Sequence, residues 1–301
     1  MEKILKGTTA YRIFLSDRAK GMLSHAYMLH FSDSKNMRAA LKIFAKEFFS
    51  ADAALAARID NESYTDLTVY PAEGKKISAD GISEIIGDSA LRPVEGDKKL
   101  YIICGFEGAS ALVQNKLLKT LEEPQEGIYF LLGATTLAPV LDTVLSRVKL
   151  LEVPPFSERE IFEALERQGR NPENAAAAKS CNGSLGAAQN MVSGGWFKEV
   201  REAAEEICSV GKISQIPDVV KKYGEIKYKQ ELLSEMQNVY FSALNGGKLN
   251  TSLQKHTIIY ALEELNRANA DLKFNAFFQG LLYDFMLKVV KENDKWLKLQ
   301  V

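Results

Sequence analysis

Short apolar runs that alternate with helical patterns dominate the first half of the sequence and restrict the folds open to it. The runs are rich in β-branched and aromatic residues and lie at 66–70, 99–103, 128–132 and 148–153. Helical patterns separate them at 39–49, around 82–86 and at 113–123. Strands separated by helices pair in parallel and carry helices on both faces of the sheet. The alternation therefore predicts an α/β domain built on a parallel sheet.

The pattern changes after Pro154 and Pro155, beyond which we expect no strand. Short helices are predicted at 158–168 and 172–180, followed by a turn at Asn182-Gly183. We therefore expect an α/β domain at 1–155, a small helical domain at 156–208 and an all-helical domain at 209–301.

The last third of the chain is predicted to be helical, because Pro217 is its last proline. A break is expected at Gly246-Gly247. Apolar residues at helical spacing predict the core of a helix bundle: Phe274, Phe277, Phe278, Leu281, Leu282, Phe285 and Val289.

Composition narrows the class of function. The net charge of -1 argues against a surface that binds nucleic acid throughout, although a local basic patch remains compatible with it. No apolar run reaches the roughly 18 residues of a membrane helix, and the first residues lack a signal-peptide pattern. The cysteines Cys104, Cys181 and Cys208 are too far apart to form a disulfide framework or a paired metal motif. We expect a cytoplasmic protein with no membrane contact.

The most specific motif runs from Asn115 to Pro124 and reads N-K-L-L-K-T-L-E-E-P. By its physical pattern alone it is an amphipathic helix that a proline ends, and it could serve only for packing. The string resembles the N-x-L-L-K-x-L-E-E-P signature of the clamp-loader subunits in the AAA+ family, and it is too long to be a chance match.

Other segments resemble the same family in the same order. The segment 24–29 is similar to the entry into its first strand. Leu141, Thr143, Ser146 and Arg147 match its L-P-T-x-x-S-R-C element, with Asp142 in place of the proline and Val148 in place of the cysteine. The resemblance is strong over 24–153 and looser beyond. It implies an AAA+-type α/β domain at 1–155, a small helical lid at 156–208 and an all-α oligomerisation collar at 209–301.

The family's phosphate-binding loop is degenerate here. Such a loop needs glycines, whose N–H groups surround the phosphates, and a lysine that meets them. The aligned segment 31–37 has no glycine, and Met37 stands where the lysine is expected. Phe31 and Asp33 oppose a triphosphate by bulk and by charge. We expect a remnant strand–loop–helix, with a variant nucleotide site as the alternative.

Two further ATPase elements are missing. Cys104 and Gly105 follow the strand 99–103, where an aspartate would hold Mg²⁺ and a glutamate would orient water. Glu107 lies beyond and is interpreted as a solvated loop residue. Glycine in the segment 183–186 replaces an arginine that active relatives carry. We therefore expect no catalytic group in cis, no cofactor and no small-molecule substrate of its own.

A zinc site is not expected. Many relatives carry a four-cysteine zinc module after the first helix, and tetrahedral zinc needs about four such ligands. Ser50 stands where the first cysteine usually falls, and 51–65 contains neither cysteine nor histidine. His25, His30 and His256 are scattered along the chain and are interpreted as structural or solvated residues.

Arg147, with Ser146 before it, is the functional group that remains. Read alone, it is a surface arginine beside a strand. The resemblance implies an arginine finger that acts in trans on a neighbouring subunit's nucleotide, a role suited to the paired donors of a guanidinium.

Taken together, the resemblance implies a delta-prime-like, non-hydrolysing subunit of the DNA polymerase III clamp loader, a hetero-oligomer that acts in DNA replication. The implied partners are gamma/tau- and delta-type subunits, with the sliding clamp and primed DNA reached through the complex. A divergent AAA+ ATPase and another pseudo-ATPase subunit, such as delta, remain the alternatives.

Overall fold

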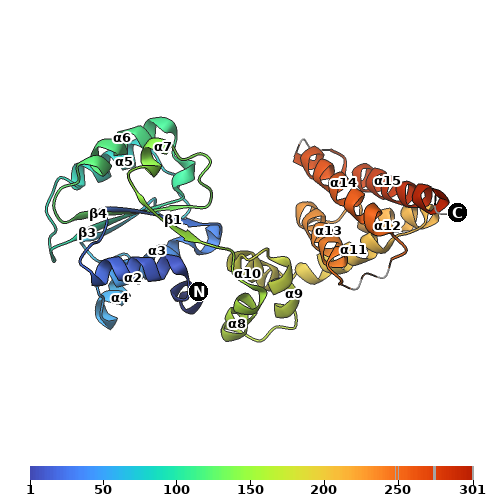
Figure 1. Ribbon diagram of the computed structural model, residues 1–301, viewed down its shortest axis with the longest axis horizontal. Helices are drawn as coiled ribbons and strands as arrows, with labels where there is room; N and C mark the ends of the chain where they lie inside the picture. Colours follow the sequence, from blue (N-terminus) through green and yellow to red (C-terminus); the bar gives the residue numbers. More distant parts are fainter. Residues whose placement is uncertain (248, 250, 274–275, 300–301) are drawn as a thin grey trace. The chain divides into compact units, whose positions relative to one another are not determined.

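The computed structural model describes residues 1–247, 249, 251–273 and 276–299 (Figure 1). The chain forms two compact units, Met1–Asn190 and residues 191–301. The division into three domains at 155 and 208 stays a prediction.

A five-stranded parallel sheet forms the centre of the first unit, with the strand order β2-β3-β4-β1-β5. The position of β1 between β4 and β5 follows from its composition, because its residues are mostly apolar and nearly all buried. Met28 in β1 pairs with Leu132 on one side and Leu150 on the other. The predicted parallel sheet is confirmed. Its strands are β1 (Ala26–Phe31), β2 (Leu67–Tyr70), β3 (Lys99–Cys104), β4 (Ile128–Ala134) and β5 (Lys149–Val153).

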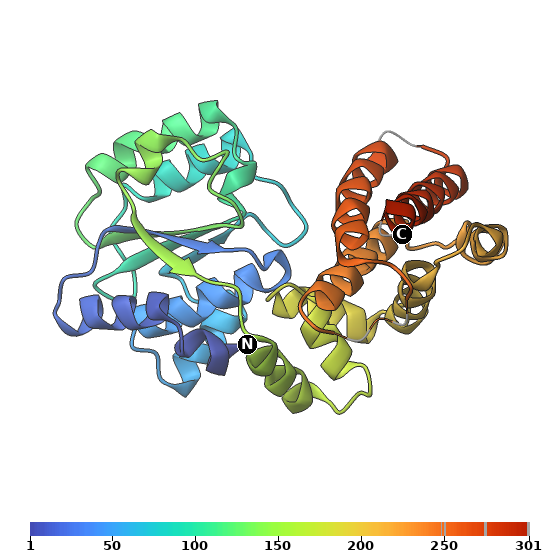
Figure 2. The same cartoon turned by 45° about the vertical axis from the view of Figure 1, so that its right-hand side comes forward.

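Helices cover both faces of this sheet, as Figures 1 and 2 show. One face carries α2 (Thr9–Ala19), α3 (Ser34–Phe48) and α4 (Ala53–Asp60), next to the short α1 (Glu2–Lys6). The other carries α5 (Ala79–Asp88), α6 (Ala111–Glu122) and α7 (Asp142–Leu145). Phe14 of α2 packs edge-on against Tyr27 of β1 and Phe44 of α3. Leu117 and Leu121 of α6 are fully buried with the sheet residues on the opposite face.

Three short helices complete the first unit: α8 (Glu158–Gln168), α9 (Asn174–Ser180) and α10 (Leu185–Ser193), whose last residues extend into the second. The bounds of α8 are those predicted, and its start is fixed by a capping box between Ser157 and Glu160. Pro172 precedes α9 instead of belonging to it.

The second unit is all-helical in its described part. It contains α11 (Phe197–Ser209), α12 (Ile216–Tyr223), α13 (Lys229–Leu244), α14 (Lys255–Lys273) and α15 (Phe278–Leu299), with a 3₁₀ turn at Ile213–Gln215. α13 ends just before Gly246-Gly247, as predicted. Buried residues of α11 share one apolar core with those of α13, α14 and α15.

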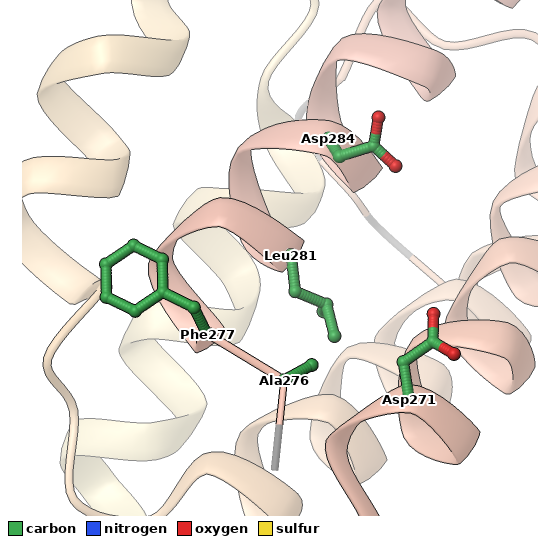
Figure 3. Close-up of a pocket in the computed structure, with 5 residues that line it drawn as sticks. All are labelled: Asp271, Ala276, Phe277, Leu281 and Asp284. Carbon is green, nitrogen blue, oxygen red and sulfur yellow. The ribbon is translucent and has the colours of Figure 1, made fainter. Parts of the chain in front are cut away.

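The predicted apolar stripe near the end of the chain is confirmed in part. Phe278, Leu282, Phe285 and Val289 are buried, and Leu281 packs against the same core. Phe277 is 75% exposed, so its assignment to the core was wrong. The reason is that α15 begins at Phe278, and Figure 3 shows the ring of Phe277 pointing away from Leu281. Phe274 lies outside the described residues.

Candidate functional site

The loop between β1 and α3 lies at the carboxyl end of an interior strand of the sheet, and open α/β sheets bind their ligands at the carboxyl ends of their strands. Asp33 in this loop is only 2% exposed and caps α3. Its Oδ1 accepts a hydrogen bond from the backbone N of Asn36 at 3.1 Å, and its Oδ2 accepts one from Asn36 Nδ2 at 2.8 Å. One first-turn N–H group of α3, that of Asn36, is therefore already bound to a carboxylate of the same chain.

The N-terminal end of α10 also contacts the carboxylate of Asp33. The backbone N of Gly186, in the first turn of α10, donates to Asp33 Oδ2 at 2.7 Å. A Cβ atom at position 186 would overlap Asp33 Oδ1, so only glycine allows this approach. Lys35 Nζ donates to Asn190 Oδ1 at 2.6 Å and is thereby directed along α10.

Met37 lies at the position where the family resemblance predicts a phosphate-binding lysine. Its side chain is buried, and a Cβ atom on Gly133 of β4 would lie only 2.7 Å from its Sδ. The residue therefore fills space between α3 and the sheet. The strand, loop and helix expected here are present as β1, the loop and α3, and the polar side chains of Asp33, Lys35 and Asn36 are hydrogen-bonded within the chain. That they are the remnant of a nucleotide site stays a prediction.

β3 ends at Cys104, and Cys104 and Gly105 stand where the family resemblance would place an aspartate and a glutamate. Gly105 has a φ of 68°, in the left-handed region that favours glycine. Burial raises the pKa of the Cys104 thiol to about 11. No disulfide joins it to Cys181 or Cys208, since all three cysteines are free.

Glu107 differs from its predicted place in a solvated loop. It belongs to a 3₁₀ turn, Phe106–Gly108, and is half-buried. The hydroxyl of Thr135 donates to its Oε1, while its Oε2 is buried with no hydrogen-bond partner in the described part of the chain. The prediction was wrong because the turn after β3 places this side chain beside the end of β4.

Arg147 lies between α7 and β5, the edge strand of the sheet, as the sequence predicts. Its Nε donates to Glu122 Oε1 at 2.6 Å, and its Nη2 is also paired with that oxygen. Its Nη1 donates to the carbonyl oxygen of Thr143 at 2.7 Å and to Ser146 Oγ at 3.1 Å. The side chain remains 32% exposed. The isolated chain thus holds the guanidinium in place while leaving it within reach of solvent.

The surroundings of Arg147 form an open cavity of about 470 Å³ lined by His25, Leu121, Glu122, Ser146 and Arg147. His25 Nε2 lies 2.7 Å from the carbonyl oxygen of Leu121, which agrees with a structural role for this histidine. Sequence reasoning identified Arg147 and Ser146 but missed Glu122 as the ion-pair partner of Arg147. The signal was available, because Glu122 belongs to the 115–124 motif.

A second cavity, of about 350 Å³, lies between α14 and α15 in the other unit and is lined by Asp271, Ala276, Phe277, Leu281 and Asp284 (Figure 3). Within the described ranges, no group of three or more His, Cys, Asp or Glu side chains is placed to hold a metal ion. None of the described helices is long and apolar enough to cross a membrane. The absence of zinc stays a prediction.

Known proteins resemble this chain in sequence and in structure. Residues 7–157 match the family described as "DNA polymerase III, delta subunit". The delta' subunit of Bacillus subtilis is 27% identical over 190 residues, which are 60% of this chain and 58% of that protein. The delta' subunit of Haemophilus influenzae is 34% identical over 96 residues, or 32% of this chain and 29% of that protein. The matches therefore span less than two thirds of these relatives' own lengths.

Among solved structures, a gamma-subunit-related protein of DNA polymerase III from Thermotoga maritima aligns with a TM-score of 0.45 and 16% identity, over 92% of this chain and 98% of that one. The family match covers half of the present chain. The chain therefore belongs to the DNA polymerase III delta-subunit family, as a delta-prime-like clamp-loader subunit.

Proposed function

We propose that this chain is a non-hydrolysing member of a clamp-loader ring, which helps to place a sliding clamp on primed DNA and supplies Arg147 to a neighbouring ATP site. The observation that carries the proposal is the position of Asp33. Its buried carboxylate accepts a backbone N–H group at the start of α3, that of Asn36, and adds a negative charge where a phosphate would lie.

Electrostatics opposes nucleotide binding at this position. A phosphate oxygen about 4 Å from the Asp33 carboxylate would be repelled by about 4 kcal/mol at an effective dielectric constant of about 20. That repulsion alone weakens binding by roughly three orders of magnitude. The Nζ of Lys35 is hydrogen-bonded to Asn190 Oδ1, and Met37, where the resemblance places the phosphate-binding lysine, carries no charge.

Arg147 is suited to act outside its own subunit. Its ion pair with Glu122 is partly exposed, and such pairs contribute about 0–1 kcal/mol, so the guanidinium can leave Glu122 at small cost. Facing the charge that develops on a transferred phosphoryl group, an arginine finger accelerates hydrolysis by about 10³–10⁵. The lowering of the activation free energy for hydrolysis therefore exceeds the free energy lost when Arg147 leaves Glu122 by several kcal/mol.

The proposed partners are gamma/tau- and delta-type subunits, with the clamp and DNA contacted through the assembly. Relatives with the names gamma and tau also match this chain in sequence, which supports a common ring architecture. We assign the segment 209–301 to the collar that joins the ring and the segment 156–208 to the lid.

The test is reconstitution of the full-length chain with gamma/tau- and delta-type subunits from its own cell, followed by mass measurement of the purified complex. We expect a complex that contains one copy of this chain. If the gamma/tau- and delta-type subunits form a complete ring that does not contain this chain, its role as a ring member is refuted.

A further inference from the structure

The starts of two helices converge on one buried carboxylate in the first unit. Asp33 caps α3, which has 15 residues, and accepts from Gly186 at the start of α10, which has nine. The N-terminal turns of helices carry unpaired N–H groups and a partial positive charge. The Asp33 side chain lies between two such ends and supplies the negative charge that both favour.

Neighbouring residues extend the contact between the same two helices. Asn36 Nδ2 donates to Gln189 Oε1 at 3.2 Å as well as to Asp33, and Lys35 Nζ donates to Asn190 Oδ1 at 2.6 Å. Each of these residues comes from the first turn of α3 or from α10. A buried polar group is stable only when hydrogen-bonded, so separating the two helices would leave Asp33 short of a donor.

An apolar contact joins the same segment to the sheet at its base. The ring of Phe31, at the end of β1, lies 5.8 Å from the ring of Phe156, just before α8. Edge-on ring contacts tolerate rotation better than hydrogen bonds do. The hydrogen bonds of Asp33 and its neighbours therefore add a directional restraint on the segment 156–190.

We infer that Asp33 is an intramolecular latch: its carboxylate holds the helical segment 156–190 against the α/β sheet as a bound phosphate could, and no nucleotide is needed. The segment then keeps one orientation whatever the ATP concentration. This inference concerns the isolated chain and goes beyond the proposed place in a loader ring.

Asp33→Asn is the most informative variant. An asparagine can still cap α3 through its Oδ1, but its amide NH₂ would face the N–H of Gly186 and the Nδ2 of Asn36, which are both donors. Helix α3 keeps its cap while the latch is lost. Gly186→Ala removes the latch from the other side, because the new methyl group would overlap Asp33 Oδ1.

Asp52→Asn is the matched control. Asp52 caps α4 by accepting from the backbone N of Leu55 at 2.8 Å, in the same way that Asp33 caps α3. α4 lies on the sheet domain, and this substitution leaves the contact with α10 intact. It reports the effect of changing a capping aspartate without opening the latch.

The experiment uses the full-length chain and two measurements. Backbone hydrogen exchange is followed in the peptide that contains Gly186. The distance distribution between nitroxide labels at Glu126→Cys and Arg159→Cys is measured by pulsed electron resonance. Burial raises the pKa of all three native thiols, so labelling near pH 7 favours the introduced, exposed cysteines.

We expect Asp33→Asn and Gly186→Ala to accelerate exchange of the amide at position 186 by about tenfold or more, relative to the intrinsic rate of the residue there. Both variants should also broaden the distance distribution, while Asp52→Asn matches the wild type in both measurements. Wild-type exchange and an unchanged distribution in both latch variants would overturn the inference. If circular dichroism shows that Asp33→Asn does not fold, the same two measurements on Gly186→Ala test the inference. Both measurements are made on the isolated chain and do not depend on whether it enters a loader complex. A negative result would therefore refute the latch and leave the proposed function untouched.

Discussion

Arg147 donates from Nε to Glu122 Oε1 at 2.6 Å and so links the loop before β5 to the last turn of α6. Two segments of the family resemblance, the 115–124 motif and the Ser146-Arg147 pair, therefore meet in one contact. Each side chain remains partly exposed, at 32% for Arg147 and 45% for Glu122.

This exposure limits what the pair contributes to folding. We predict that Glu122→Gln and Arg147→Ala each lower the free energy of unfolding by no more than about 1 kcal/mol, since exposed ion pairs are worth about 0–1 kcal/mol. Leu121→Ala is the contrast, because Leu121 is fully buried and its truncation should cost about 2–5 kcal/mol. Urea unfolding followed by circular dichroism measures all three. A loss above about 3 kcal/mol in Arg147→Ala would assign this arginine to structure.

ATP binding is the second test. We predict that the isolated chain shows no calorimetric signal with Mg-ATP at micromolar to submillimolar concentrations, because Asp33 caps α3 and Met37 is buried where the family resemblance predicts phosphate-binding groups. A gamma-type subunit titrated in the same buffer serves as the positive control. Micromolar affinity that disappears when this loop is mutated would establish a variant nucleotide site.

Truncation tests the role of the helical second unit. A chain that ends after Gly194 keeps α8, α9 and α10 and should fold, because the first unit has a core of its own. A chain cut near 208 would instead expose Val200, Ala203 and Ile207 of α11, whose partners lie in the second unit. We predict that the chain ending after Gly194 melts cooperatively and no longer joins the reconstituted complex. Assembly at full affinity would exclude the second unit as the collar.

The pH dependence of stability follows from Glu62. Arg38 Nε donates to Glu62 Oε1 at 2.7 Å, and Lys42 Nζ lies 2.6 Å from the same oxygen. Hydrogen bonding from Arg38 is the main cause that lowers the pKa of Glu62 from 4.5 to about 2. A carboxyl group whose pKa is lower in the folded state than in the unfolded state stabilises the fold at pH values above its unfolded-state pKa. For Glu62 this stabilisation is lost as the pH falls from about 4.5 towards 2.

We therefore predict that Glu62→Gln lowers the free energy of unfolding by about 1 kcal/mol at pH 7, since the group is partly exposed and solvent screens the pair. The difference from the wild type should shrink steadily below pH 4.5 in urea titrations. An equal difference at pH 7 and at pH 2.5 would show that the ion pair is not its source.

The sequence predicted the sheet well because buried parallel strands are continuous apolar runs. It also predicted the bounds of α8, whose start the structure shows to be fixed by the capping box of Ser157 and Glu160. It misplaced Phe277 because helical spacing alone cannot show where α15 begins. It misplaced Glu107 because the 3₁₀ turn after β3 depends on contacts with β4 that are distant in sequence.

At the candidate site, sequence reasoning reached individual residues but not their pairing. Asp33 was noted for its charge and position 186 for its glycine, while the hydrogen bond between them spans 153 residues of sequence. The same holds for Glu122 and Arg147. Local patterns predict which elements form, whereas contacts between elements require the topology that brings them together.

The trans action of Arg147 is the central chemical claim, and clamp- and DNA-stimulated ATPase activity of the reconstituted complex tests it most directly. Wild-type, Arg147→Ala and Arg147→Lys chains are compared at matched occupancy. We predict that Arg147→Ala enters the complex but lowers total hydrolysis only in part, since one neighbouring site is affected, and that clamp loading falls further. Arg147→Lys should rescue poorly, because an ammonium lacks the paired donors of a guanidinium. Unchanged hydrolysis and unchanged loading in Arg147→Ala would contradict the claim and leave Arg147 as a surface arginine paired with Glu122.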